Sequence, residues 1–258
     1  MEKITSKANN LIKETAKLFT SRKARYENHQ FALEGARLCF DAVNSGYQPD
    51  VLLFTEELQE KYPAEIENAI ASSKRACVIS GEVASKLSET QTPQGVFAVC
   101  SMKPFAEKAE PGKKYIALDN LQDPANLGAI LRTAEALGVS GAILYNCCDA
   151  YNPKALRAAM GSSLRLPMII SDNLAEDIIR LKADGFSVYA TVPDSEARDI
   201  TKIDFPTSSV CVIGNEGNGI SAEVKAACSE LVTINMLGRA ESLNASMAGA
   251  IAMWEMLR

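Results

Sequence analysis

The sequence predicts an α/β protein of two domains, the larger of which is built on a mostly parallel sheet. Apolar, strand-like runs alternate with helical patterns along the chain, and the alternation strengthens after residue 115. Such βα alternation is typical of parallel sheets that helices cover on both faces. A stretch rich in charge, proline and glycine separates the two blocks. We therefore expect a small α/β domain over residues 1–102, a linker over 103–114 and an α/β domain over 115–258.

Short apolar runs bounded by polar segments predict the individual strands. In the first domain these runs are FALEG (31–35), VLLF (51–54), ACVIS (76–80) and GVFAVC (95–100). Helical patterns between them cover 36–46 and 57–73. In the second domain the strand-like runs are YIALDNL (115–121), GAILY (141–145), FSVYATV (186–192), VCVIG (210–214) and LVTIN (231–235). Ligands of open parallel sheets bind beyond the carboxyl ends of the strands, so the segments after 121, 213 and 235 are the first candidates for chemistry.

The composition excludes several classes of function. The 258 residues are 47% hydrophobic and 23% charged, which is ordinary for a globular protein. No apolar run approaches the ~20 residues of a membrane span, and the N-terminus lacks the apolar core of a secretory signal. His29 is the only histidine, and the seven cysteines have no metal-ligand spacing, which disfavours a histidine triad or a zinc site. We expect a cytoplasmic protein with reduced thiols, no metal and no membrane contact.

The net charge of −5 is unevenly distributed along the chain. Residues 1–25 carry seven basic side chains against two acidic ones. A basic segment on an acidic body can contact a polyanion locally. A solvated amphipathic helix would explain the same charges.

The glycine loop GNEGNGIS, residues 214–221, lies between a strand-like run and a helical pattern. A phosphate-binding loop would end in Gly-Lys-Ser or Gly-Lys-Thr, or would read GxGxxG. This loop has no lysine or arginine and contains Glu216, whose carboxylate would repel a phosphate. A tight turn in which glycines adopt positive φ is the alternative to a ligand-binding role.

The segment after the first strand of the second domain, 122–138, predicts a helix with Asn126 as N-cap and Gly138 as C-terminal cap. Its apolar stripe leaves Arg132 on the opposite side, away from the core. There Arg132 would either pair with Glu135 or hold a ligand at the edge of the sheet.

The segment after the last strand predicts a helix with Ser242 and Asn244 at its N-terminus, where capping residues are usual. Its apolar face consists of Leu243, Met247, Ala250, Ile251 and Trp254. Polar residues thus precede three helices, each of which follows a strand of the same sheet. Together these three segments predict one site.

Four motifs, in this order and spacing, resemble the SpoU or TrmH-like family of S-adenosylmethionine-dependent RNA ribose 2′-O-methyltransferases, in the SPOUT superfamily. They are DPANLGAILRTAEALG, NPKALRAAMGSSLRLP, CVIGNEGNGIS and INMLGRAESLNASMA. SKANNLIKETAKL, FALEGARL and TQTPQGVFAV resemble the small L30e- or L7Ae-like substrate-binding domain of many members. The resemblance implies an α/β-knot fold, with a deep trefoil knot tied by residues 215–258, and a homodimer with its active sites near the subunit interface.

The resemblance also assigns roles to residues of this chain. Adenosylmethionine would bind in a bent shape against main-chain groups of Gly214, Ile234 and Leu243, with Met236 close by. The implied catalytic residues are Arg132, Asn126, Glu216, Ser242 and Asn244. By analogy with RNA enzymes, the residues that would contact the RNA backbone are Lys154, Arg157 and Arg165, although solvated charges would explain each of them.

An arginine is a poor base because its pKa exceeds ~12. We therefore expect Arg132 to hold the target phosphate and to stabilise the emerging alkoxide. Asn235 stands where the family usually has proline, which is expected to loosen the cofactor loop. Ala125 replaces a common glycine and Ala245 a larger aliphatic residue, and none of the three changes removes a chemical group from the site.

The separate N-terminal domain favours ribosomal RNA over tRNA as the substrate. The alternatives are a tRNA 2′-O-methyltransferase and a non-catalytic RNA-binding or ribosome-assembly factor on the same fold.

Overall fold

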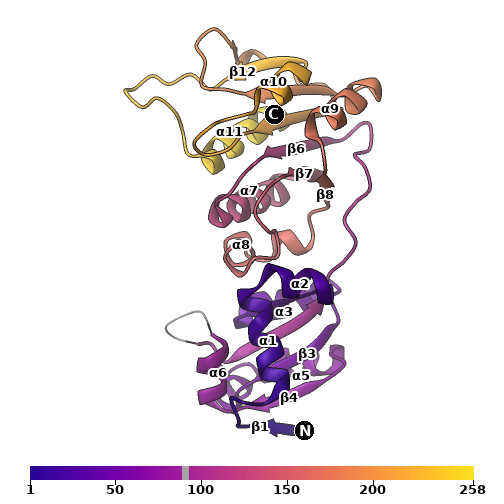
Figure 1. The fold of residues 1–258 in the computed structure, drawn as a ribbon, viewed down its shortest axis with the longest axis vertical. Coiled ribbons are helices and arrows are strands. Elements are labelled where there is room, and N and C mark those ends of the chain that lie inside the picture. Colours follow the sequence, from indigo (N-terminus) through magenta and orange to yellow (C-terminus); the bar gives the residue numbers. More distant parts are fainter. Residues whose placement is uncertain (89–92) are drawn as a thin grey trace. The chain divides into compact units, whose positions relative to one another are not determined.

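The computed structural model describes residues 1–88 and 93–258 and divides into two compact units (Figure 1). Unit 1 comprises residues 1–103 and 151–164, and unit 2 comprises residues 104–150 and 165–258. Residues 151–164, which the sequence analysis placed in the second domain, therefore pack with unit 1. The residues Thr90–Thr92 of the TQTPQGVFAV motif lie outside the described residues.

The described part of unit 1 is a five-stranded mixed sheet with helices around it. Its strands are β1 (Glu2–Ile4), β2 (Gln30–Glu34), β3 (Pro49–Phe54), β4 (Ala76–Ile79) and β5 (Val96–Ser101). They lie in the order β1-β4-β3-β5-β2, and β5 runs antiparallel to both of its neighbours. The helices are α1 (Asn10–Thr20), α2 (Arg22–Asn28), α3 (Ala36–Asn44), α4 (Glu56–Lys61), α5 (Pro63–Ser72), α6 (Gly81–Leu87) and α8 (Pro153–Ala159), followed by the 3-10 turn η1 (Ser162–Leu164).

The single helix expected over 57–73 is two helices, α4 and α5. The break falls at Tyr62, which has φ −132° and ψ 60° and precedes Pro63. Proline disfavours helical backbone in the residue before it and has no N–H to continue the helix, but it fits the first turn of a new helix.

Unit 2 confirms the predicted parallel sheet. Its strands are β6 (Lys114–Asp119), β7 (Gly141–Tyr145), β8 (Met168–Ser171), β9 (Ser187–Thr191), β10 (Arg198–Asp199), β11 (Ser209–Ile213) and β12 (Glu230–Thr233). They lie in the order β10-β12-β9-β11-β6-β7-β8, with every pair parallel. The helices are α7 (Pro124–Leu137), α9 (Leu174–Ala183), α10 (Ala222–Ala227) and α11 (Ala245–Leu257), with the 3-10 turn η2 at Ile200–Lys202.

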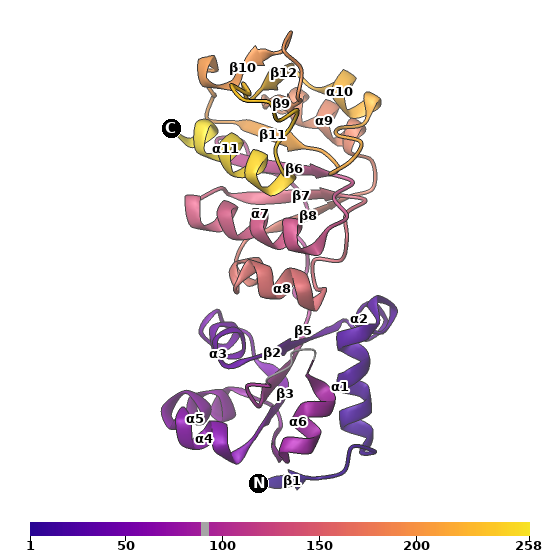
Figure 2. The same ribbon diagram turned by 90° about the vertical axis from the view of Figure 1, so that its left-hand side faces the viewer.

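Helices cover both faces of this sheet (Figure 2). α9 and α10 pack together on one face, where Ile178 and Val224 meet the strand residues Val188 and Val212 in one apolar cluster. α7 and α11 pack together on the other face, where Gly249 lies against Ile213. The alternation of Val212 and Ile213 between the faces follows from the two-residue period of a strand.

The strand order decides where the site forms. β11 lies between β6 and β9, and β12 is the next neighbour of β9. Because parallel strands end at one edge of the sheet, the segments that follow these four strands lie side by side. Within residues 1–88 and 93–258, no helix combines the length and the apolar character needed to cross a membrane.

Candidate functional site

The glycine loop is held closed by its own backbone and by Asn215. The amide of Asn215 donates to the carbonyl of Gly219 at 3.0 Å, and the amide of Gly219 donates back to the carbonyl of Asn215 at 3.0 Å. The side-chain Oδ1 of Asn215 accepts hydrogen bonds from the amides of Gly217 at 2.9 Å and Asn218 at 3.0 Å. The loop therefore presents a fixed main chain before any ligand binds.

Two glycines of this loop are required for different reasons. Gly219 has φ +68°, the left-handed conformation that other residues rarely adopt. Gly214 does not have a positive φ, but a Cβ there would lie 2.2 Å from the carbonyl carbon of Gly219 and 2.3 Å from the nitrogen of Ile220. The expectation of a turn with positive φ thus holds for Gly219, whereas Gly214 is needed because two backbone segments touch.

The carboxylate of Glu216 joins the glycine loop to the segment after β6. One oxygen accepts hydrogen bonds from the amide of Asp123 at 3.0 Å and from Nδ2 of Asn126 at 3.1 Å. The other oxygen accepts from the amide of Gln122 at 3.2 Å. Burial raises the pKa of the Glu216 carboxyl, but the hydrogen bonds from Asn126 and the backbone amides outweigh it, so the pKa lies below its ordinary value of 4.5.

Asn126 also forms a hydrogen bond with the segment that follows β12. Its Oδ1 accepts a hydrogen bond from Nδ2 of Asn244 at 3.0 Å. Asn244 in turn is the N-cap of α11, and its Oδ1 accepts from the amide of Ser246 at 2.9 Å. Glu216, Asn126 and Asn244 therefore tie together the segments that follow β11, β6 and β12.

Asn126 is not the N-cap of α7 that the sequence analysis expected. The cap is Asp123, whose side chain accepts from the amide of Ala125 at 2.8 Å, and Pro124 occupies the first helical position. Asn126 lies inside the first turn and is buried. Its side chain is thus free of the capping role and turns toward Glu216. Gly138 caps the other end of α7 with φ 82°, as predicted.

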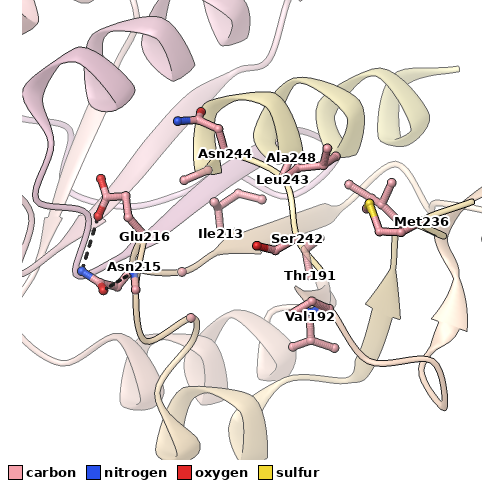
Figure 3. Close-up of a pocket in the computed structure, with 16 residues that line it drawn as sticks. Thr191, Val192, Ile213, Asn215, Glu216, Met236, Ser242, Leu243, Asn244 and Ala248 are labelled. Atoms are coloured by element: carbon pink, nitrogen blue, oxygen red, sulfur yellow. Dashed lines mark hydrogen bonds between the residues drawn. The ribbon is translucent and has the colours of Figure 1, made fainter. Parts of the chain in front are cut away.

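A pocket of about 390 Å³ opens beside these hydrogen bonds (Figure 3). Seven of the predicted site residues line it, namely Gly214, Glu216, Ile234, Met236, Ser242, Leu243 and Asn244. Figure 3 shows Glu216 and Asn244 toward one end of the pocket and Met236 toward the other. The structure thus brings the glycine loop and the segment after β12 together around one hollow, as predicted, while the roles of the individual residues remain predictions.

The carboxyl end of β9 also contributes to the pocket, through its last residue, Thr191, and through Val192 and Pro193 after it. We did not predict these residues. The signal was present, because the apolar run 186–192 ends at Pro193 and the carboxyl end of every neighbouring strand faces the same edge.

Arg132 is exposed on α7 and is not among the residues that line the pocket. It makes no hydrogen bond or ion pair within the described residues. The alternative pairing with Glu135 is therefore wrong, and Glu135 instead accepts a hydrogen bond from Nε of Arg165 at 2.9 Å. The guanidinium of Arg132 is therefore available to a ligand.

The three residues expected to contact RNA are divided between the two units. Lys154 is exposed on α8, and Arg157 of the same helix lines a hollow of unit 1 together with Arg37. Arg165 belongs to unit 2 and is engaged by Glu135. Within the part of the chain that the structure describes, no group of His, Cys, Asp or Glu side chains could hold a metal ion.

Substitution Gly214→Ala is expected to destabilise the protein by more than about 3 kcal/mol, because the new methyl group would overlap the backbone of Gly219. The matched control is Gly217→Ala, where a Cβ would meet only Oδ1 of Asn215 at 3.7 Å. We expect that control to stay within about 0.5 kcal/mol of wild type. Urea unfolding measures both, and equal losses for the two variants would contradict the role of Gly214.

Substitution Glu216→Gln is expected to cost about 1–2 kcal/mol of stability at neutral pH, allowing for the solvent exposure of the carboxylate. Because the folded pKa of Glu216 is lowered, the stabilisation is present above the ordinary pKa of 4.5 and is lost as the pH falls through the folded value. Urea unfolding at a series of pH values should therefore show the difference from wild type shrinking below pH 4.5.

The control for this series is Glu223→Gln, since Glu223 is exposed on α10 and makes no hydrogen bond or ion pair within the described residues. A difference for Glu216→Gln that grows on acidification would disprove the carboxylate's role.

Two family models match the chain. The SpoU rRNA Methylase family matches residues 113–254, and the MRM3-like substrate binding domain matches residues 9–98. The first match contains the glycine loop and the segments after β6, β9 and β12, so it covers every part of the pocket.

Relatives with both units are similar over their full length. The chain is 33% identical over 258 residues to the 23S rRNA (guanosine(2553)-2′-O)-methyltransferase RlmP of Bacillus subtilis, covering 99% of each protein. It is 36% identical over 257 residues to a Synechocystis sp. protein named as an uncharacterized tRNA/rRNA methyltransferase, covering 99% of this chain and 93% of that one. The AdoMet-bound rRNA methyltransferase of Sinorhizobium meliloti has a TM-score of 0.87 at 30% identity, covering 99% of this chain and 97% of that one. The chain therefore belongs to the SpoU rRNA methylase family.

Proposed function

We propose that this protein transfers a methyl group from S-adenosylmethionine to a ribose 2′-hydroxyl of RNA, with ribosomal RNA as the substrate. The observation that carries the proposal is the pocket at the carboxyl edge of the unit 2 sheet, whose walls are fixed by Glu216, Asn126 and Asn244. The relative RlmP, which covers both units, is named as a 23S rRNA 2′-O-methyltransferase. That match favours ribosomal RNA over tRNA.

The pocket suits adenosylmethionine in size and in charge. Its volume of about 390 Å³ lies within the range of small-molecule sites. The lining residues include no lysine or arginine, and Glu216 is the only charged side chain among them. A carboxylate favours a ligand with a positive sulfonium and disfavours one that carries phosphates.

Bound adenosylmethionine supplies a methyl group that its sulfonium has already activated. Gly214, Ile234 and Leu243 would hold the cofactor through main-chain groups, and Met236 would close one end of the pocket. Ser242 lines the same pocket with no histidine or lysine among the other lining residues, so the side chains that usually activate a serine nucleophile are missing from the lining. Its hydroxyl would instead orient the reacting groups.

Arg132 would bind the RNA phosphate next to the target ribose. A guanidinium remains protonated at every physiological pH, so Arg132 stabilises the developing alkoxide and does not remove the proton. Lys154, Arg157 and Arg165 would add backbone contacts, and the MRM3-like domain would supply further RNA contacts from unit 1.

The exposed face of α11 supports a homodimer. On α11, Met247, Ile251 and Trp254 are 59%, 36% and 60% exposed. Leu243, which the sequence analysis placed on the same helical face, precedes the helix and is 36% exposed. A run of large apolar side chains in solvent is typical of a protein interface. α7, which carries Arg132, packs beside α11, so a dimer through this face would bring the guanidinium and the pocket to one interface.

Two further properties are proposals that rest on the family resemblance. The segment from Asn215 to Arg258 would pass through a loop as a trefoil knot, which is rare among folds. The protein would act in the cytoplasm, where its RNA substrate and adenosylmethionine are both present.

The direct test incubates the protein and adenosylmethionine with ribosomal RNA and tRNA from cells that lack the protein. We expect one new 2′-O-methyl nucleoside in ribosomal RNA, measured by mass spectrometry after digestion. Arg132→Ala should lower the rate by about 10²–10³-fold, as expected for the loss of one transition-state donor. Cofactor affinity should be unchanged, because Arg132 does not line the pocket.

Arg180→Ala is the matched control, since it removes an exposed arginine from α9 on the other face of the sheet and should leave the rate unchanged. A product in tRNA alone would support a tRNA methyltransferase. If neither a product nor cofactor binding is detected, a non-catalytic RNA-binding factor becomes the better description.

Substitution Trp254→Glu should convert the dimer to monomer, because it places a charge in the proposed apolar interface. Ile179→Glu is the control, since Ile179 is also 60% exposed but lies on α9. Sedimentation velocity measures the oligomeric state, and circular dichroism checks that both variants are folded. A monomeric wild type at micromolar concentration, or a dimer that survives Trp254→Glu, would argue against this interface.

A further inference from the structure

The segment that follows β12 forms one wall of the pocket, although it has no regular secondary structure. Residues 234–243 contain no helix or strand, and Leu237 at their centre is fully exposed. Ile234 and Met236 of this segment line the pocket, but Asn235 between them does not. The side chain of Asn235 is thus available for a different contact.

Asn235 uses its side chain to attach the segment to the sheet. Its Nδ2 donates a hydrogen bond to Oδ2 of Asp199 at 2.7 Å. Among the residues that the structure describes, this is the only hydrogen bond from residues 234–243 to the rest of the protein. This contact is therefore the hydrogen-bonded attachment of the wall to the sheet.

Asp199 is a fixed anchor for that contact. It lies on β10, where it is in register with Thr233, the last residue of β12. Its Oδ1 accepts hydrogen bonds from the amide of Thr201 at 2.9 Å and from Oγ1 of the same residue at 2.7 Å. With Oδ1 occupied by Thr201, Oδ2 is left to receive Asn235.

We propose that Asn235 is a positioning residue for the cofactor, holding Ile234 and Met236 in place through its hydrogen bond to Asp199. This inference rests on the proposed binding of adenosylmethionine in the pocket. Replacement of the family's proline was expected to loosen the loop. The hydrogen bond to Asp199 provides a restraint of another kind, because a tether from the side chain fixes the segment where a proline would fix its φ.

The test exchanges the two partners. Asn235→Asp places two carboxylates against each other and should raise the dissociation constant of adenosylmethionine about tenfold, the equivalent of one charge-assisted hydrogen bond. Asp199→Asn should weaken binding too, because one amide cannot accept from both Thr201 and Asn235 as the two carboxylate oxygens do. The double variant should restore affinity to within about twofold of wild type, because the amide at position 199 would donate to the carboxylate at position 235 while its oxygen still accepts from Thr201.

Calorimetry measures the dissociation constants, and hydrogen exchange of residues 234–243 without cofactor measures the order of the segment. Exchange should quicken in both single variants and return to the wild-type rate in the double variant. At saturating cofactor the methylation rate should be the same in all four proteins, because the substitutions act on the order of the empty segment and neither side chain lines the filled pocket. Asp204→Asn, which removes a nearby exposed charge, is the control and should change none of these quantities.

The two failures are distinguishable. If the wild type does not bind adenosylmethionine, the proposed function fails. If the wild type binds it and Asn235→Asp binds it equally well, or if the double variant binds no better than the single ones, the positioning role of Asn235 is disproved while the proposed function stands.

Discussion

The carboxylate of Glu216 is the contact on which the geometry of the site depends. It belongs to the loop after β11, yet it binds the amides of Gln122 and Asp123 and the side chain of Asn126, all of which follow β6. A carboxylate suits this position because it only accepts hydrogen bonds, and every group that faces it is a donor. Asn126 can both donate and accept, so it donates to Glu216 and accepts from Asn244, the N-cap of α11.

The pocket is thus fixed at two ends by different means. At one end, a chain of hydrogen bonds among Glu216, Asn126 and Asn244 joins three loops. At the other end, the wall that carries Met236 is attached to β10 through Asn235 and Asp199. No cation lines the space between them, while Arg132 stands outside it in solvent. On the proposed function, a positively charged cofactor and a polyanionic RNA would be recognised by groups of opposite charge in different places.

Periodicity predicted most of the strands and missed three, β1, β8 and β10. All three are edge strands of two to four residues, each paired on one side only. Their short runs carry little pattern, and their stability comes from the neighbouring strand that tertiary folding provides. The central strands of unit 2 are buried on both faces and form the apolar runs that a sequence reveals directly.

The sequence by itself determined which residue types stand at the strand ends: a loop without a cation, an amide and an arginine on one helix, and a polar helix mouth after the last strand. These are local patterns of spacing and composition, so they can be recognised without knowing the fold. Only the tertiary structure decided which of them meet. Asn126 faces Glu216 and Asn244, which are 90 and 118 residues away in the chain, and Gly214 is needed because Gly219 crosses it. Such contacts arise because parallel strands bring distant segments to one edge, a consequence of strand order that no local pattern contains.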